Sequence, residues 1–185
     1  TILNVGITPL TLPALSDMTG NHPFALDSYQ RFLEGFCKSI LRIDHSVLDA
    51  KLQENKDLAD HTELLETLIS GKIGAERLCD TRYLLEQCIH AVILSSHSST
   101  AQAYRKKTGL PDSLGTAVTV QAMVFGNKGA NSGTGVAFSR DPNSGTQKVC
   151  GDWISNAQGD DVVAGDSLTS DISEFAATLP SAYEE

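Results

Sequence analysis

A change of apolar periodicity near Pro111 constrains the fold of this chain more than any other feature. Between about residues 23 and 108, apolar side chains recur at spacings of three and four, as in the stripe from Tyr29 to Leu41, which is the period of one helix face. After Pro111, β-branched residues become common, which is typical of strands. Helices followed by strands predict an α+β fold rather than alternating βαβ units.

The helical part carries signals for at least four helices. One follows the stripe 29–41 and another the stripe 84–93. Two more begin at Asp60 and at Ser99, because each has a Glu or Gln three residues later, the spacing of a capping box. Gly109 supplies the stop signal of the last helix.

The later part predicts strands joined by turns. The runs 116–125 and 135–139, with a Gly-rich stretch between them, predict a hairpin with a long loop. The sequence 140–145 (RDPNSG) is typical of a turn, and 147–155 predicts a third strand. Residues 170–185 have a helical pattern again.

These signals predict three regions. Residues 1–22, with two prolines and two glycines, form a loop with one helical turn. Residues 23–110 form a helical subdomain, and residues 111–185 form a strand-rich subdomain that ends in a helix.

Composition excludes several classes of protein. A chain of 185 residues that is 41% apolar is large enough to bury a core without cross-links. Its formal net charge of -9 argues against a nucleic-acid partner, and its apolar runs are too short to cross a bilayer. Four cysteines without a CxxC pair argue against a zinc site and favour the reducing cytoplasm.

The residues alone identify no catalytic constellation. The Gly-rich stretch 126–133 fits neither a Walker A nor a dinucleotide-binding pattern, so a flexible hairpin loop is favoured over a phosphate contact. His90 and His97, predicted on one helix, lack the spacing of a metal pair. Asp160 and Asp161 lie in a second Gly-rich stretch, where solvated loop charges are the favoured interpretation. On an extended segment two adjacent carboxylates would point in different directions and could not act as a pair.

Three motifs together resemble one family. The stretches 116–140 (TAVTVQAMVFGNKGANSGTGVAFSR), 141–145 (DPNSG) and 156–165 (NAQGDDVVAG) are similar to the nucleotide-binding domain of the pyruvate, phosphate dikinase family, and less closely to phosphoenolpyruvate synthase. The order and spacing of the motifs match as well. The least recognisable part, between about 45 and 80, is shorter than is usual in the family.

The resemblance implies an ATP-grasp-like nucleotide-binding domain that is part of a longer transferase. ATP would phosphorylate a histidine on a separate swivelling domain, and the phosphate would then pass to pyruvate, so that ATP, phosphate and pyruvate yield AMP, pyrophosphate and phosphoenolpyruvate. None of the five histidines here lies in that phosphohistidine motif. The resemblance also implies a kinase and is compatible with a homodimer of the full-length enzyme.

Four residues correspond to nucleotide-binding positions of the family. Gln121 would lie at the adenine end of the cleft, facing the same cleft as Val162. Asp160 and Val162 would read the adenine amino group and ring nitrogen, Val162 through its backbone. Thr1 would lie near the β- and γ-phosphates. Asp160 replaces the family's Glu, and its side chain is one methylene shorter. Either the hydrogen bond to adenine is made through the backbone or through water, or the affinity for ATP is lower.

The family's catalytic residues and magnesium ligands correspond to no position of this sequence. A Lys and an Arg precede position 1 in the family, and an Asp-x-Glu that holds Mg²⁺ and a Gln-x-Arg follow position 185. We therefore expect no catalytic residue and no metal ligand in this chain, and no phosphate transfer by this chain alone. Two alternatives stay open: a non-catalytic nucleotide-binding or structural module, and phosphoenolpyruvate synthase.

Overall fold

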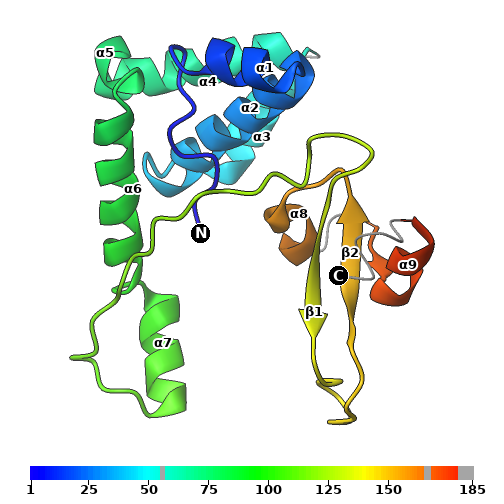
Figure 1. Cartoon of the computed structure of the whole chain (residues 1–185). Helices are drawn as coiled ribbons and strands as arrows, with labels where there is room; N and C mark the ends of the chain where they lie inside the picture. Colours follow the sequence, from blue (N-terminus) through cyan, green and yellow to red (C-terminus); the bar gives the residue numbers. More distant parts are fainter. Residues whose placement is uncertain (55–56, 165–167, 179–185) are drawn as a thin grey trace. The chain divides into compact units, whose positions relative to one another are not determined.

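The computed structural model describes residues 1–54, 57–164 and 168–178, and these fall into two compact units. Unit 1 is Thr1–Met123 and unit 2 is Val124–Glu185. Unit 1 holds α1 (Leu12–Thr19), α2 (His22–Ser39), α3 (His45–Glu54), α4 (Leu58–Ile73), α5 (Ala75–Leu78), α6 (Thr81–Ser95) and α7 (Ser99–Thr108) (Figure 1). Unit 2 holds β1 (Gly133–Phe138), β2 (Cys150–Ser155), α8 (Gly159–Ala164), β3 (Ser170–Asp171), the 3-10 turn η1 (Ile172–Glu174) and α9 (Phe175–Thr178). The α+β class predicted from the sequence is confirmed.

Helix α2 is the centre of unit 1. The predicted apolar stripe is buried on this helix from Tyr29 to Cys37, whereas its last members, Ile40 and Leu41, lie beyond the helix end and are half-buried. The rings of Phe32 and Phe36 meet edge to face with centroids 5.8 Å apart. The helix packs against α1 and α4, so Leu65 and Ile69 of α4 complete the same cluster. The buried members of this cluster are Ile7, Tyr29, Phe32, Leu33, Phe36, Cys37, Leu48, Leu65, Ile69, Leu78, Leu84 and Cys88.

The helix starts lie slightly before the predicted positions. Asp57, rather than Asp60, caps α4 by accepting from the Ala59 N–H at 3.0 Å. Ser98, rather than Ser99, caps α7 by accepting from the Ala101 N–H at 3.2 Å. Gly109 ends α7 with a φ of 70°, as predicted, because a left-handed residue is a common helix stop.

The prediction for residues 1–22 was too low in helix content. Helix α1 covers eight of these residues, which is more than the one turn expected. The side chain of Thr11 donates to the Gly6 carbonyl at 2.8 Å and accepts from the Thr8 N–H at 2.8 Å. These bonds order the turn before the helix, while Pro13 in the first turn is compatible with helix geometry.

The hairpin predicted between 116–125 and 135–139 is wrong. The structure has no strand over 116–125, and among the described residues those from Gly115 to Val124 make no backbone hydrogen bond. Strand preference is expressed only where a neighbouring strand supplies partners, and β1 pairs instead with β2. The predicted strands at 135–139 and 147–155 are confirmed as β1 and β2, with the predicted turn 140–145 between them.

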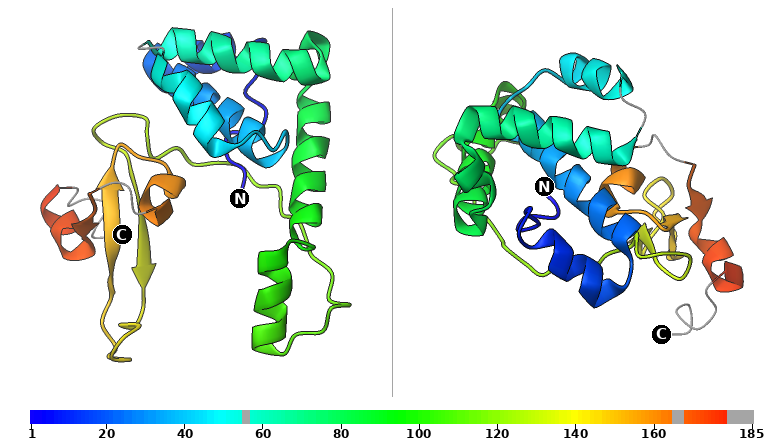
Figure 2. Two further views of the ribbon diagram at one scale, coloured as in Figure 1. Left: turned by 180° about the vertical axis from the view of Figure 1, so that it is seen from behind. Right: turned by 90° about the horizontal axis from the view of Figure 1, so that it is seen from above.

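Unit 2 is built on a narrow antiparallel sheet of order β1-β2-β3. Gly133 lies opposite Ser155 and Phe138 opposite Cys150, and Figure 2 shows β1 and β2 side by side along their length. Beyond the strands, the carboxylate of Asp141 accepts from the N–H groups of Asn143 and Ser144, at 2.7 and 3.2 Å. These bonds hold the pKa of Asp141 below its usual value and fix the turn.

The predicted helix over 170–185 is present only in part. Its described portion consists of η1 and α9, whose Phe175 ring packs edge to face on Trp153 with centroids 5.1 Å apart. The remainder of the predicted helix lies outside the described residues. The predicted regions 1–22, 23–110 and 111–185 therefore stay predictions about organisation.

Candidate functional site

The segment that follows β2 carries two of the residues predicted to bind nucleotide. At its start Asn156 has a φ of 50°, and its N–H donates to the Ser132 carbonyl at 2.7 Å. Asn tolerates the left-handed conformation better than most residues. The chain thereby leaves the β-sheet and turns into α8.

The side chain of Gln158 joins this segment to the Gly-rich stretch. Gln158 is 1% exposed, and its Nε2 donates to Oδ1 of Asn127 at 3.1 Å. A Cβ added to Gly126 would lie 2.3 Å from the Ala157 carbonyl oxygen and 2.6 Å from that of Gly133. Only glycine permits this approach, so the stretch that the sequence predicted as a flexible loop is packed at its first two residues.

Asp161 stabilises the start of α8. Gln158 precedes the helix, and its N–H donates to Oδ2 of Asp161 at 2.8 Å, while the Asp161 N–H donates to the Gln158 carbonyl at 3.1 Å. This is the backbone half of a capping box, and acidic side chains in a first helical turn also favour the helix dipole. Sequence reasoning missed it because glutamine is an uncommon N-cap residue.

Asp160 and Val162 both lie on α8. The loop expected here is wrong, because the segment is helical. The two carboxylates still cannot act as a pair, since adjacent helical side chains also point in different directions. The Asp160 side chain is exposed and that of Val162 is half-buried. Because the helix begins at Gly159, the N–H of Val162 makes the first i to i−4 hydrogen bond of α8, to the carbonyl of Gln158.

Thr1 and Gln121, the other two predicted contacts, belong to unit 1 and are exposed. The structure thus brings Asp160 and Val162 together on one helix. The placement of Thr1 and Gln121 beside them, and the shared cleft of Gln121 and Val162, stay predictions.

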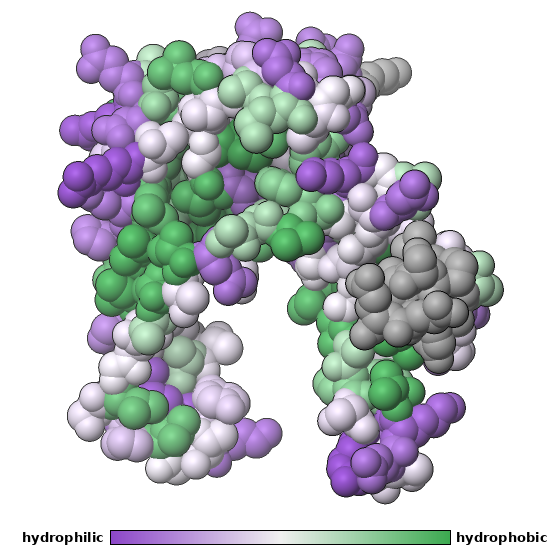
Figure 3. Space-filling model, viewed as in Figure 1, coloured by the Kyte–Doolittle hydropathy of each residue, from purple (hydrophilic) through white to green (hydrophobic). Residues whose placement is uncertain are grey.

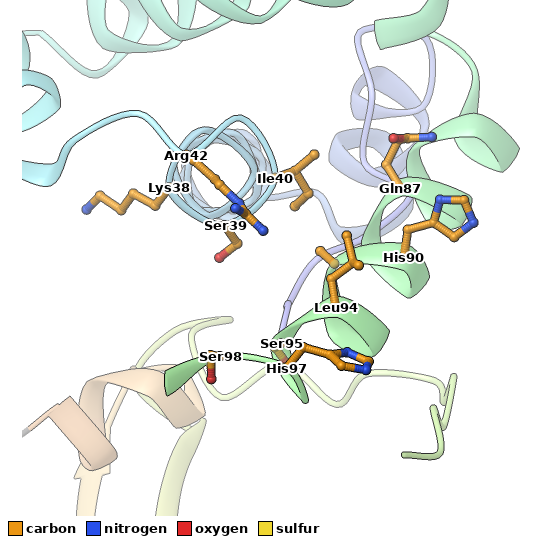
Figure 4. Close-up of a pocket in the computed structure, with 11 residues that line it drawn as sticks. Lys38, Ser39, Ile40, Arg42, Gln87, His90, Leu94, Ser95, His97 and Ser98 are labelled. Carbon is orange, nitrogen blue, oxygen red and sulfur yellow. The ribbon is translucent and has the colours of Figure 1, made fainter. Parts of the chain in front are cut away.

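Unit 1 contains a separate cavity of about 790 Å³ between the end of α2 and α6. His90 lies on α6, whereas His97 follows the end of that helix, so the prediction that both share one helix is wrong. Figure 4 shows Leu94 directed towards Ile40, while Lys38 extends to one side and the two histidine rings to the other. Lys38 also pairs with Glu34 and Asp49, at 3.7 and 3.6 Å. Apart from Ile40, Ala91 and Leu94, the residues that line this cavity are polar or charged.

The described residues contain no group of three or more His, Cys, Asp or Glu side chains that could hold a metal ion. Within the same part of the chain, no helix is both long and apolar enough to cross a membrane. All four cysteines are free thiols, and burial raises the pKa of Cys37 to about 12 and that of Cys88 to about 11. Such thiols stay protonated at neutral pH and are poor nucleophiles.

Comparison with known proteins identifies relatives over the whole sequence. Residues 23–180 match the model of the family described as the pyruvate phosphate dikinase, AMP/ATP-binding domain. The chain is 37% identical to a pyruvate, phosphate dikinase of Rickettsia felis over 203 residues, which covers 100% of this chain and 23% of that protein. It is 37% identical over 199 residues to the chloroplastic enzyme of Flaveria pringlei and 38% identical over 200 residues to a chloroplastic enzyme of Zea mays, and it spans 21% of each.

The matched stretches are longer than this chain of 185 residues, so these relatives carry residues that this chain lacks. The predicted position of that shortening, between about 45 and 80, stays a prediction. The chain spans less than a quarter of the length of each of these relatives.

Proposed function

This chain belongs to the family of the pyruvate phosphate dikinase AMP/ATP-binding domain, and on that premise we propose that it is the ATP-binding portion of a dikinase-like phosphotransferase. The family match over residues 23–180 carries the proposal, because it includes most of the helical unit and the segment around α8. The longer enzyme would use ATP, phosphate and pyruvate to make AMP, pyrophosphate and phosphoenolpyruvate.

In this proposal the segment around α8 recognises adenine. The exposed carboxylate of Asp160 is an acceptor for the exocyclic amino group, and the backbone of Val162 reads the ring nitrogen. Because α8 engages the Val162 N–H, the first turn of this helix must open before that N–H can bind the base. Asp161 and Gln158 position the segment without contacting the nucleotide.

Other parts of the longer protein would supply the chemistry. Mg²⁺ neutralises phosphate charge in phosphoryl transfer, and the family resemblance assigns its ligands to the part of the longer protein that follows this chain. The phosphate acceptor would be a histidine on a separate domain of the same protein. Free thiols at all four cysteines support a cytoplasmic location, and a homodimer of the longer enzyme stays a prediction.

The test is calorimetric titration of the 185-residue chain with ATP and MgCl₂, beside three variants. Asp160→Asn removes the charge at constant size, Asp160→Glu restores the family's longer side chain, and Asp17→Asn removes an equally exposed charge from α1 of unit 1. A hydrogen bond to a charged group contributes about 1.5 kcal/mol or more when it forms. The asparagine oxygen still accepts a hydrogen bond, so only the charge-assisted part of this contribution is lost. We therefore expect severalfold weaker binding for Asp160→Asn, tighter binding for Asp160→Glu, and no change for Asp17→Asn.

Two results would count against the proposal in different ways. Absence of any heat of ATP binding to the unmodified chain would leave it as scaffold and contradict the proposed function. Equal affinities for all four proteins would keep nucleotide binding but remove the Asp160 side chain from the site.

A further inference from the structure

The two units differ sharply in how much apolar surface they bury. Every member of the large core cluster lies in unit 1. Among the described residues of unit 2, the only buried apolar side chains are Trp153 and Ala157, at 7% and 6% exposure. Burial of apolar surface is the dominant favourable contribution to folding, so unit 2 lacks most of the contribution that holds unit 1 together.

Unit 2 also exposes more large apolar side chains than it buries. Val136 and Phe138 on β1 are 36% and 47% exposed, and Val163 on α8 is 77% exposed. Figure 3 shows apolar side chains at the surface over the strands of this unit, as well as over α6 of unit 1. What orders unit 2 is largely hydrogen bonding along the β1–β2 pair and between Gln158 and Asn127. Each such bond adds little net stability, because the unfolded chain makes equivalent bonds to water.

We propose that unit 2 unfolds as a separate cooperative unit at lower denaturant concentration than unit 1, and that nucleotide stabilises unit 2 selectively. The first half follows from the unequal cores, since cooperative units of one protein can open at different free energies. The second half rests on the proposed function, which places the adenine contacts Asp160 and Val162 on unit 2. A ligand that binds only the folded form of a unit shifts its unfolding equilibrium by mass action.

The chain carries its own probes for the two units. Trp153 is the single tryptophan of the sequence, and it packs on Phe175 within unit 2, so its fluorescence reports that unit. Unit 1 holds the seven helices α1–α7, whereas α8 and α9 of unit 2 have six and four residues. Circular dichroism at 222 nm therefore reports mainly unit 1.

The experiment is urea unfolding of the 185-residue chain followed by both signals, with and without MgATP at one hundred times the dissociation constant measured by calorimetry, or at 5 mM if no binding is detected. We expect the Trp153 transition to precede the circular dichroism transition. Saturating MgATP should lower the unfolding constant of unit 2 about a hundredfold and leave the later transition in place. Magnesium triphosphate, which lacks adenine, is the matched control and should shift the Trp153 transition less.

The outcomes separate this inference from the proposed function. Coincident transitions in the absence of nucleotide would overturn the independence of unit 2, whatever ATP does. Separate transitions with calorimetric ATP binding but no shift of the Trp153 transition would overturn the coupling and leave the proposed function intact. Separate transitions with neither binding nor shift would overturn the coupling and the proposed function together, while independence of the units would stand.

Discussion

Replacement of Gly126 by alanine should disrupt unit 2 and leave unit 1 unchanged. The new Cβ would lie 2.3 Å from the Ala157 carbonyl oxygen and 2.6 Å from that of Gly133, where Cβ atoms essentially never come within 3.0 Å of a neighbour. Both obstacles are backbone atoms, so the chain must retreat by about 0.7 Å at Ala157, the shortfall between 2.3 and 3.0 Å. That retreat moves the segment that leads into α8.

The cost can be worked from these contacts. Overpacking of this kind costs about 1–3 kcal/mol, and the hydrogen bond from Gln158 to the neighbouring Asn127 (3.1 Å) adds about 1 kcal/mol if it is lost. Alanine also stabilises the folded state by about 0.5–1 kcal/mol, because it lowers the conformational entropy of the unfolded chain. The net destabilisation of unit 2 is therefore about 1–3.5 kcal/mol, a factor of roughly five to a few hundred in its unfolding constant.

The assay is urea unfolding followed by Trp153 fluorescence for unit 2 and by circular dichroism at 222 nm for unit 1. The matched control is Gly115→Ala, since a Cβ there meets nothing within 4 Å and should change stability by no more than about 0.5 kcal/mol. We expect Gly126→Ala to lower only the fluorescence midpoint and to weaken ATP binding. A fluorescence midpoint equal to that of the control would refute the close packing of Gly126 against Ala157.

Three further predictions concern unit 1. Tyr29→Phe should lower the free energy of unfolding by about 1.5 kcal/mol, since the buried hydroxyl donates to Oε1 of the Glu66 carboxylate at 2.8 Å. A double-mutant cycle with Glu66→Ala, which removes the acceptor, checks the pairing, and purely additive effects would contradict it. Leu33→Ala should lower the free energy of unfolding of unit 1 by about 3 kcal/mol, because this side chain is 0% exposed in the centre of the core. Thermal unfolding followed by circular dichroism should show this loss, while the transition followed by Trp153 fluorescence stays unchanged. Burial raises the pKa of Cys37 to about 12 and that of Cys88 to about 11 from 9.0. The contribution of these two thiols to the free energy of unfolding is therefore complete below about pH 9 and is lost as pH rises through 11 to 12. Urea titrations at successive pH values should show this decline in stability, and an unchanged pH dependence in the double variant Cys37→Ala, Cys88→Ala would argue against it.

The helical layer could be predicted from the sequence because its causes are local. The stripe from Tyr29 to Leu41 has the period of one helix face, and α2 buries the part of it from Tyr29 to Cys37. Gly109 ends α7 where the sequence placed its stop. The observed caps of α4 and α7 are Asp57 and Ser98 rather than the predicted Asp60 and Ser99. Several acidic or hydroxyl side chains lie near each helix start, and sequence spacing alone does not decide which one accepts the capping hydrogen bond.

The strand region was predicted less well because pairing depends on contacts distant in sequence. The run 116–125 has the composition of a strand, yet β1 took β2 as its partner, and composition carries no information about that choice. The contact between Gln158 and Asn127 joins residues thirty-one positions apart. Composition alone indicated solvated loop charges at Asp160 and Asp161, whereas the family resemblance assigned Asp160 and Val162 to adenine. The structure shows that both lie on one helix, and their role stays a prediction.

The two adjacent carboxylates of α8 illustrate why recognition and stability are divided in this segment. Asp161 bonds the backbone of Gln158, so its carboxylate contributes to the start of the helix, whereas the side chain of Asp160 is exposed and suited to meet a ligand. The helix that Asp161 favours also engages the Val162 N–H that the proposed adenine contact requires. Opening that first turn would be prohibitive inside a rigid core, but it is feasible in the unit that buries the fewest apolar side chains, because segments that rearrange on binding come from the less stable parts of a protein. The small core of unit 2 is therefore compatible with, and useful to, the nucleotide binding that we assign to it.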